Sequence, residues 1–309
     1  MSHKNKECFV VQIQKALDSR LAIGMSKHND KRIRNESGRR LADDRIYSWS
    51  TYRSYLKHAV YFSRWIEKNH PECKTLAKAR PYVNDWIQSR IDQGMSAYTV
   101  KLETAALAKV YGCSTKDFIQ TPERNRSKIV RSRGDKIRDK HFSKKNNAEL
   151  VTFCKCTGLR RHELKKVRGD QLIQNEDGSY SVQVISGKGG KDRTVPVTGS
   201  PEEVLTVVRI MKASGNSKVW ATVHNALDVH ALRAEYAMRV YRKHARPVES
   251  LRGQFMDDPD RKGKTISSLY KSRGEYAGQV YDRAALLEVS KALGHNRVSV
   301  VAEHYLWVR

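Results

Sequence analysis

A basic segment without apolar periodicity interrupts the chain between Pro122 and Lys145. It holds ten lysines and arginines against three acidic residues, with few apolar side chains. On either side of it, apolar residues recur with helical or strand periods, so each side can bury a core of its own. The sequence therefore predicts two domains, over residues 1–120 and 142–309, joined by a basic linker over residues 121–141.

The charge balance of the chain points to a polyanionic partner. Lysine and arginine number 59 against 33 acidic residues, which gives a formal net charge of +26. Binding a polyanion relieves the self-repulsion of such an excess, so the composition favours nucleic acid without distinguishing DNA from RNA. We find no apolar run of membrane-spanning length and no signal-peptide core, and we expect a cytoplasmic, nucleoid-associated protein. The five cysteines are scattered without zinc-ligand spacing and are expected to be reduced thiols.

The N-terminal domain is predicted to be all helical. Its apolar side chains recur at helical spacing, and serine, threonine, proline and glycine stand where helices begin and end. The predicted helices cover residues 9–21, 50–69, 81–94 and 96–112. A polar, basic segment over residues 31–45 shows no such spacing, and we expect it to be partly exposed.

The C-terminal domain is predicted to be mostly helical with a small antiparallel sheet. Tyr180, Val182 and Val184 alternate with polar residues, as in a half-buried strand. Residues 187–192 supply a glycine-rich turn, and residues 193–197 form the returning strand. Helices are expected over residues 148–158, 200–214, 230–244 and 284–293, with a short one around Tyr305. The fold class is therefore mainly α, with an α+β second domain.

Five short motifs in the C-terminal domain carry residues suited to chemistry on a phosphate. Each motif alone is common: an arginine with an i, i+3 carboxylate, a basic hairpin tip, a histidine and an arginine on one helix face, a residue after a helix-ending glycine, and a tyrosine that could simply pack. Their order along one chain is more specific. In sequence order they are TGLRRHEL with Arg160 and Glu163, GKGGKDR with Lys188 and Lys191, HALR with His230 and Arg233, LGH with His295, and EHYLWVR with Tyr305.

Together these motifs resemble the tyrosine recombinase (phage integrase) family. The matching words are TGLR-x-x-EL, GKG-x-K-x-R-x-VPV, H-x-LR, ALGH and a tyrosine shortly after. In the N-terminal domain, TYRSYLKHAVYFSRWI and MSAYTVKLETAALAKVY resemble two helices of the family's core-binding domain. The resemblance covers roughly residues 45–309. It implies a two-domain clamp on double-stranded DNA that performs site-specific recombination as a homo-oligomer, a tetramer on paired sites, with accessory DNA-bending proteins as possible partners.

The resemblance also implies a role for each site residue. Tyr305 would attack phosphorus and form a 3′-phosphotyrosyl link, while Arg160 and Arg233 would bind the non-bridging oxygens with planar, permanently charged groups. Lys188 would protonate the leaving 5′-oxygen, and Lys191, in the same loop, is the alternative. The supporting roles are proton transfer by His230, a hydrogen bond to a non-bridging oxygen by His295, and orientation of the arginines by Glu163. This chemistry requires no metal and no other cofactor.

Three features depart from the family pattern. Tyr305 stands ten positions after His295, one more than is usual, and His295 stands 62 positions after Arg233, which is far more than usual. The extra segment, residues 244–283, could be an added DNA contact, a protomer contact or a flexible insertion. Four residues follow Tyr305, so we do not expect the C-terminal segment with which many relatives couple neighbouring protomers.

The basic linker has two possible roles, a solvated connection or a strap across DNA phosphates. The candidate DNA-binding residues in and beside it are Arg124, Arg126, Lys128, Arg131 and Arg133. Two other functions compete with recombination. A type IB topoisomerase would share the catalytic residues and relax supercoiled DNA as a monomer, and a non-catalytic accessory protein would keep only DNA binding.

Overall fold

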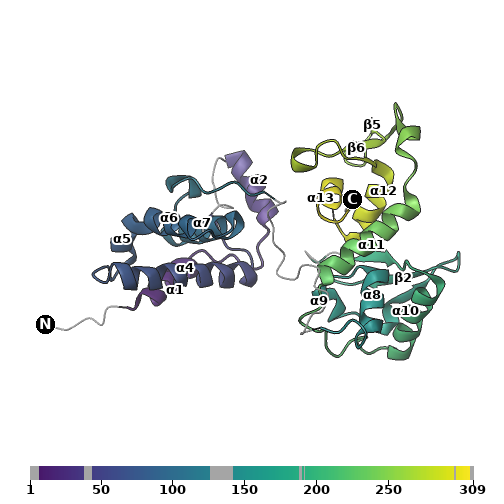
Figure 1. The fold of residues 1–309 in the computed structure, drawn as a ribbon, viewed down its shortest axis with the longest axis horizontal. Coiled ribbons are helices and arrows are strands. Elements are labelled where there is room, and N and C mark those ends of the chain that lie inside the picture. Colours follow the sequence, from purple (N-terminus) through teal and green to yellow (C-terminus); the bar gives the residue numbers. More distant parts are fainter. Residues whose placement is uncertain are drawn as a thin grey trace. The chain divides into compact units, whose positions relative to one another are not determined.

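The chain forms two compact units, residues 1–130 and residues 131–309. The computed structural model describes residues 7–37, 44–125, 142–187, 190, 192–295 and 297–306, and Figure 1 traces them. The linker predicted over residues 121–141 lies largely outside these residues and stays a prediction.

In the described part of the first unit, every regular element is a helix, as predicted. Helices α4 and α7 pack along each other, and α1 and α6 pack against α7 (Figure 1). Ser48 caps α4 and Ser96 caps α7, which ends at Gly112 in the left-handed region with φ 66°. The elements are α1 (Phe9–Asp18), α2 (Lys27–Ser37), α4 (Trp49–Asn69), α5 (Leu76–Ala79), η1 (Arg80–Tyr82), α6 (Val83–Asp92), α7 (Ala97–Tyr111) and η2 (Thr115–Asp117).

Helix α2 overlaps the polar segment for which no helix is predicted. Its Asp30 is buried, and its carboxylate accepts hydrogen bonds from the Tyr47 hydroxyl at 2.6 Å and from Arg45 Nη1 at 3.1 Å. These polar contacts tie α2 to the residues just before α4. Apolar periodicity cannot reveal a helix that is held in this way.

The second unit combines helices with a three-stranded antiparallel sheet, which confirms the predicted fold class. The sheet order is β1-β2-β3, and Val182 of β2 lies opposite Val195 of β3. Helix α11 packs against both α8 and α12 (Figure 1). The elements outside residues 244–282 are α8 (Ala148–Thr157), α9 (Arg161–Leu164), η4 (Gly169–Gln171), β1 (Leu172–Gln174), β2 (Tyr180–Val184), β3 (Arg193–Pro196), α10 (Pro201–Ser214), α11 (Val229–His244), α12 (Arg283–Leu293) and α13 (Val298–His304).

The segment after α11 is folded as two small hairpins. It comprises η5 (Val248–Leu251), hairpin β4 (Phe255–Asp257) with β5 (Thr265–Ser267), and hairpin β6 (Leu269–Lys271) with β7 (Val280–Asp282), which η6 (Gly274–Tyr276) separates. Leu251 and Tyr281 bury their side chains. Residues 244–283 therefore form a folded part of the second unit.

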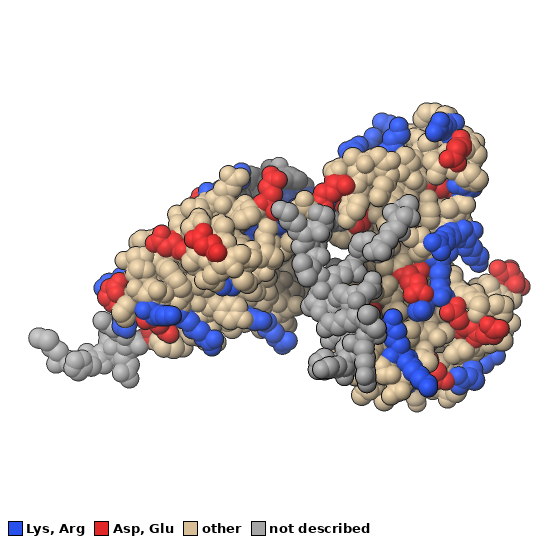
Figure 2. Space-filling view, in the orientation of Figure 1, with Lys and Arg blue, Asp and Glu red and all other residues tan. Residues whose placement is uncertain are grey.

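Two charged residues anchor this segment to the rest of the second unit. The buried carboxylate of Asp282 accepts from Arg246 Nε at 2.8 Å and caps α12 through the Ala284 backbone N–H at 2.9 Å. Arg283 donates to the Ser267 carbonyl at 2.6 Å. Beyond the anchor, the β4–β5 loop exposes Arg261, Lys262 and Lys264, and Figure 2 shows basic side chains at this end of the unit.

The five cysteines are all free thiols. Within the described ranges, none of the helices is long and apolar enough to cross a membrane.

Candidate active site

The turn between α8 and α9 places Arg160 and Glu163 side by side. Gly158 ends α8 in the left-handed region with φ 57°, where any larger residue would collide with the ring of Tyr236. Arg160 then precedes α9, and the Glu163 carboxylate turns back to accept the Arg160 backbone N–H at 2.7 Å and Arg160 Nη1 at 2.9 Å. A carboxylate in the first turn of a helix satisfies an otherwise unpaired donor. The motif therefore fixes both residues locally.

Arg193, the first residue of β3, holds the other side of Glu163. Its Nη1 and Nη2 donate to Oε1 and Oε2 of Glu163, each at 2.8 Å. Burial by itself raises the pKa of Glu163, but the hydrogen bonds from Arg193 and from the Arg160 backbone outweigh it and lower the pKa to about 2. Glu163 is therefore a carboxylate at neutral pH. Arg193 is the last residue of the GKGGKDR motif, which is the one signal for it in the sequence, but the motif alone predicts no role for this residue.

Arg233 lies on α11 and is 2% exposed. Its two Nη atoms donate to the carbonyls of Gly158 and Leu293, and its Nε lies 3.4 Å from the Tyr305 hydroxyl. Burial, followed by the neighbouring charge of Arg160, lowers the pKa of Arg233 to about 10. The side chain therefore remains a cation at neutral pH.

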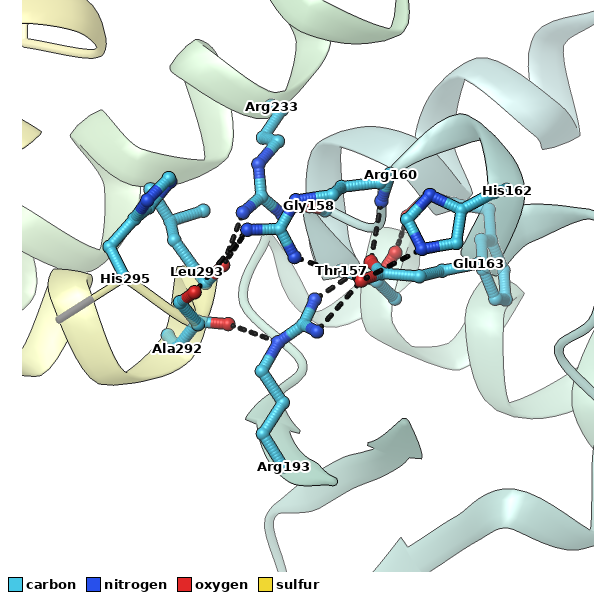
Figure 3. A network of polar contacts seen from close by, with 12 residues as sticks. Thr157, Gly158, Arg160, His162, Glu163, Arg193, Arg233, Ala292, Leu293 and His295 are labelled. Carbon is cyan, nitrogen blue, oxygen red and sulfur yellow. Dashed lines mark hydrogen bonds and ion pairs between the residues drawn. The ribbon is translucent and has the colours of Figure 1, made fainter. Parts of the chain in front are cut away.

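The C-terminal end of α12 gathers the three arginines (Figure 3). The Leu293 carbonyl accepts from Arg160 Nη2 at 2.9 Å and from Arg233, and the Ala292 carbonyl accepts from Arg193 Nε at 3.1 Å. The last carbonyls of a helix have no partner within the helix, and the helix dipole makes this end negative. The end of α12 thus binds and orients three guanidinium groups.

Tyr305 follows α13 directly, and its hydroxyl lies among these residues. His295 Nε2 is 3.3 Å from that hydroxyl, and the ring centroids of His230 and His295 lie 5.1 and 5.3 Å from the Tyr305 ring. The structure therefore brings His230, Arg233, His295 and Tyr305 together, and Arg160 joins them through the Leu293 carbonyl that it shares with Arg233.

The other predicted residues contribute less to this picture. Lys188 and Lys191 lie outside the described residues, so the choice between them stays open. Arg124 belongs to the first unit, with its guanidinium carbon 5.6 Å from the centroid of the Tyr98 ring. The remaining candidate DNA-binding residues, Arg126, Lys128, Arg131 and Arg133, also lie outside the described part.

The arrangement combines fixed positive charge with a hydroxyl and two imidazoles. Guanidinium groups match the oxygens of a phosphate in geometry as well as in charge. Holding them in advance on carbonyls and on Glu163 reduces the reorganisation that binding would otherwise require. The site is thus suited to a phosphate ester placed beside Tyr305.

Comparison with known proteins identifies the fold. No protein-family model matches the sequence, and no curated protein matches it either. Among solved structures, the chain is similar to the XerH site-specific recombinase bound to palindromic difH substrate, a post-cleavage complex, with a TM-score of 0.52, 14% identity, and coverage of 97% of this chain and 92% of that one. The pre-cleavage complex of XerH with difH gives a TM-score of 0.51, 14% identity, and coverage of 96% and 93%. The chain therefore shares the fold of XerH.

Proposed function

We propose that this chain is a tyrosine recombinase, which cuts and rejoins double-stranded DNA at specific sites through a covalent link to Tyr305. The observation that carries the proposal is the position of the Tyr305 hydroxyl, 3.4 Å from Arg233 Nε and 3.3 Å from His295 Nε2. The fold shared with the XerH site-specific recombinase and the net charge of +26 support it.

The proposed first step is attack of the Tyr305 oxygen on phosphorus. The bond from phosphorus to the 5′-oxygen breaks, which leaves a 3′-phosphotyrosyl link and a free 5′-hydroxyl. The tyrosine proton passes to His230 or to water, and Lys188 supplies the proton that the leaving oxygen takes up. In the second step the 5′-hydroxyl of another strand gives its proton to Lys188 and attacks phosphorus, and the bond to the Tyr305 oxygen breaks as that oxygen takes a proton back from His230 or water. The covalent link conserves the bond energy, so rejoining needs no ATP.

The arginines stabilise the charge that develops during this transfer. Arg160 and Arg233 face the non-bridging oxygens, and their anchors on the Leu293 carbonyl keep both guanidiniums beside the tyrosine. His295 donates a hydrogen bond to one of these oxygens, and Glu163 orients Arg160 through the bond at 2.9 Å. Removing one such donor costs other enzymes a factor of about 100 to 1,000 in rate. Exchange between two DNA sites requires several protomers, and a tetramer on paired sites, with DNA-bending proteins in support, is the assembly we propose.

Covalent trapping tests the proposal directly. Wild type, Tyr305→Phe and the control Tyr180→Phe, which removes a hydroxyl from strand β2, are incubated with a randomised library of nicked duplexes. After denaturation, protein-linked strands are recovered and sequenced. We expect adducts through the 3′-phosphate with wild type and Tyr180→Phe, and none with Tyr305→Phe.

Three results would refute the proposal. Adducts with Tyr305→Phe would place the nucleophile elsewhere, and no adduct with a folded, DNA-binding wild type would indicate the accessory protein. Adducts accompanied by relaxation of supercoiled plasmid, with no recombinant product from paired trapped sites, would favour the topoisomerase.

A further inference from the structure

Arg193 connects two parts of the second unit that both hold the arginine pair of Arg160 and Arg233. It is one of the more enclosed arginines, with a side chain 10% exposed. Its Nη atoms bind both oxygens of Glu163 beside α9, and its Nε binds the Ala292 carbonyl at the end of α12. One planar group therefore spans two elements.

One partner of Arg193, Glu163, binds Arg160 directly, and the other, Ala292, precedes the residue whose carbonyl binds both arginines. The Glu163 carboxylate accepts hydrogen bonds from Arg160 Nη1 at 2.9 Å and from the Arg160 backbone N–H at 2.7 Å. Leu293, which follows Ala292, offers the carbonyl on which Arg160 and Arg233 meet (Figure 3). A shift of Glu163 relative to the end of α12 would therefore pull Arg160 away from Arg233.

The backbone around Arg193 suits this position. Arg193 pairs with Val184 across the β2–β3 ladder, so its backbone is fixed by the sheet. Gly294 lies against its side chain, and a Cβ at that position would come within 2.9 Å of Arg193 Cδ. The absence of a side chain at Gly294 leaves the space through which Arg193 reaches Ala292.

We propose that Arg193 is a positioning residue, which holds Glu163 against the end of α12 and thereby aligns Arg160 and Arg233 with the phosphate beside Tyr305. The proposal rests on the recombinase function proposed above. Arg193 acts on the site through Glu163 and the end of α12, because its Nη atoms bind both Glu163 oxygens and its Nε binds the Ala292 carbonyl.

Loss of Arg193 should also change how the site responds to pH. The charged and titratable groups that face Glu163 are Arg160 and His162 from its own turn, Arg193 from β3 and Arg233 from α11. Without Arg193, burial of Glu163 is opposed by fewer hydrogen bonds, so the pKa of Glu163 rises. Glu163 then takes up a proton at a higher pH, and the fall in cleavage rate on the acidic side of the pH profile begins at a higher pH.

The experiment compares Arg193→Gln and Arg193→Lys with wild type in the full chain. The matched control is Arg239→Gln, because Arg239 also binds both oxygens of a glutamate, Glu203, at 2.7 and 3.0 Å in the same unit. DNA affinity, single-turnover adduct formation on a trapped site and the pH profile are measured. Groups that orient functional residues in metal sites contribute about 10- to 100-fold, and we expect a loss of this size in adduct formation for Arg193→Gln, with DNA affinity unchanged.

Arg193→Lys should recover part of the rate, because an ammonium can bind one oxygen of Glu163 but cannot span both oxygens and Ala292. Arg193→Lys also tests the proposal if Arg193→Gln fails to fold, because the acidic side of its pH profile must still shift to higher pH. Arg239→Gln should react as wild type does. A substrate with a 5′-thiolate leaving group, which departs without a proton, should show the same loss.

Several outcomes would overturn the inference. These are wild-type rates in both Arg193 variants, a parallel loss of DNA affinity, an unmoved pH profile, or rescue by the 5′-thiolate substrate, which would assign Arg193 to the step that protonates the leaving group. Failure of wild type to form any adduct would instead refute the recombinase function, so the two failures are distinguishable.

Discussion

Replacing Glu163 by glutamine should lower the stability of the second unit more than the loss of an exposed ion pair would. The side chain is 2% exposed, and its carboxylate faces Arg193 and Arg160. Its pKa falls from the ordinary value of 4.5 to about 2. At about 1.36 kcal/mol for each pKa unit, this lowering corresponds to a stabilisation of about 3 kcal/mol by the charged form. Glutamine keeps the size of the side chain but leaves the two arginines without a counter-charge, which generally costs about 3–5 kcal/mol.

The pH dependence of this loss has a definite sign. A carboxyl with a lowered pKa in the folded state stabilises the fold above its unfolded pKa, and the contribution disappears as the pH falls through the folded pKa. For Glu163 the stabilisation is complete above about pH 4.5 and is lost toward about pH 2. The difference in free energy of unfolding between wild type and Glu163→Gln should therefore be constant from neutral pH down to about pH 4.5 and should shrink below it.

The assay is equilibrium urea unfolding of the full chain at a series of pH values, with Glu203→Gln as the matched control. Glu203 also sits in the first turn of a helix, accepts a backbone N–H from Ser200 at 2.9 Å and binds both Nη atoms of Arg239. Its side chain is 28% exposed, so solvent weakens the pair and we expect a loss of about 1 kcal/mol. Equal losses in the two variants, or a difference that persists undiminished into the acid range, would refute the reasoning.

Two further substitutions probe the groups around α12. Arg233→Lys keeps the charge but cannot reach the Gly158 and Leu293 carbonyls together, so adduct formation should fall about 100- to 1,000-fold while DNA affinity changes little, and parallel losses would contradict this. Asp282→Asn weakens the charge-assisted bonds from Arg246 and should cost the second unit about 1.5–3 kcal/mol. Hydrogen exchange of residues 244–283 should then accelerate, and unchanged protection would argue against this anchor.

Elements with local signals were predictable from the sequence. Ser96 and Gly112 bound α7, and Ser200 with Glu203 begins α10, because capping side chains and left-handed glycines act within a few residues. The three-residue strands β1 and β4 to β7 were not predicted, since three residues are too few to establish an alternating pattern. Pairing with a neighbouring strand, rather than their own sequence, makes these segments extended.

The candidate site shows the same division. Arg160, His230, Arg233, His295 and Tyr305 were selected from motif order, and the structure gathers them around the end of α12. Their catalytic roles stay predictions. The carbonyl groups that orient the arginines could not be predicted, because a main-chain acceptor carries no residue-specific signal. The contact of Arg193 with Glu163 was hidden for another reason, since it joins residues 30 positions apart.

The long spacing between Arg233 and His295 is compatible with the site because α12 is fixed at both ends. At its first turn, the Asp282 carboxylate accepts the Ala284 N–H, and at its last turn the carbonyls of Ala292 and Leu293 accept guanidinium donors. Negative charge at the start of a helix and positive charge at its end both match the helix dipole. The hairpins of residues 244–283 close onto the first of these anchors, while His295 follows the other end of α12, where its backbone N–H donates to the Ser290 carbonyl at 2.8 Å. Added residues between Arg233 and α12 can therefore extend the surface of the unit without displacing the groups around Tyr305.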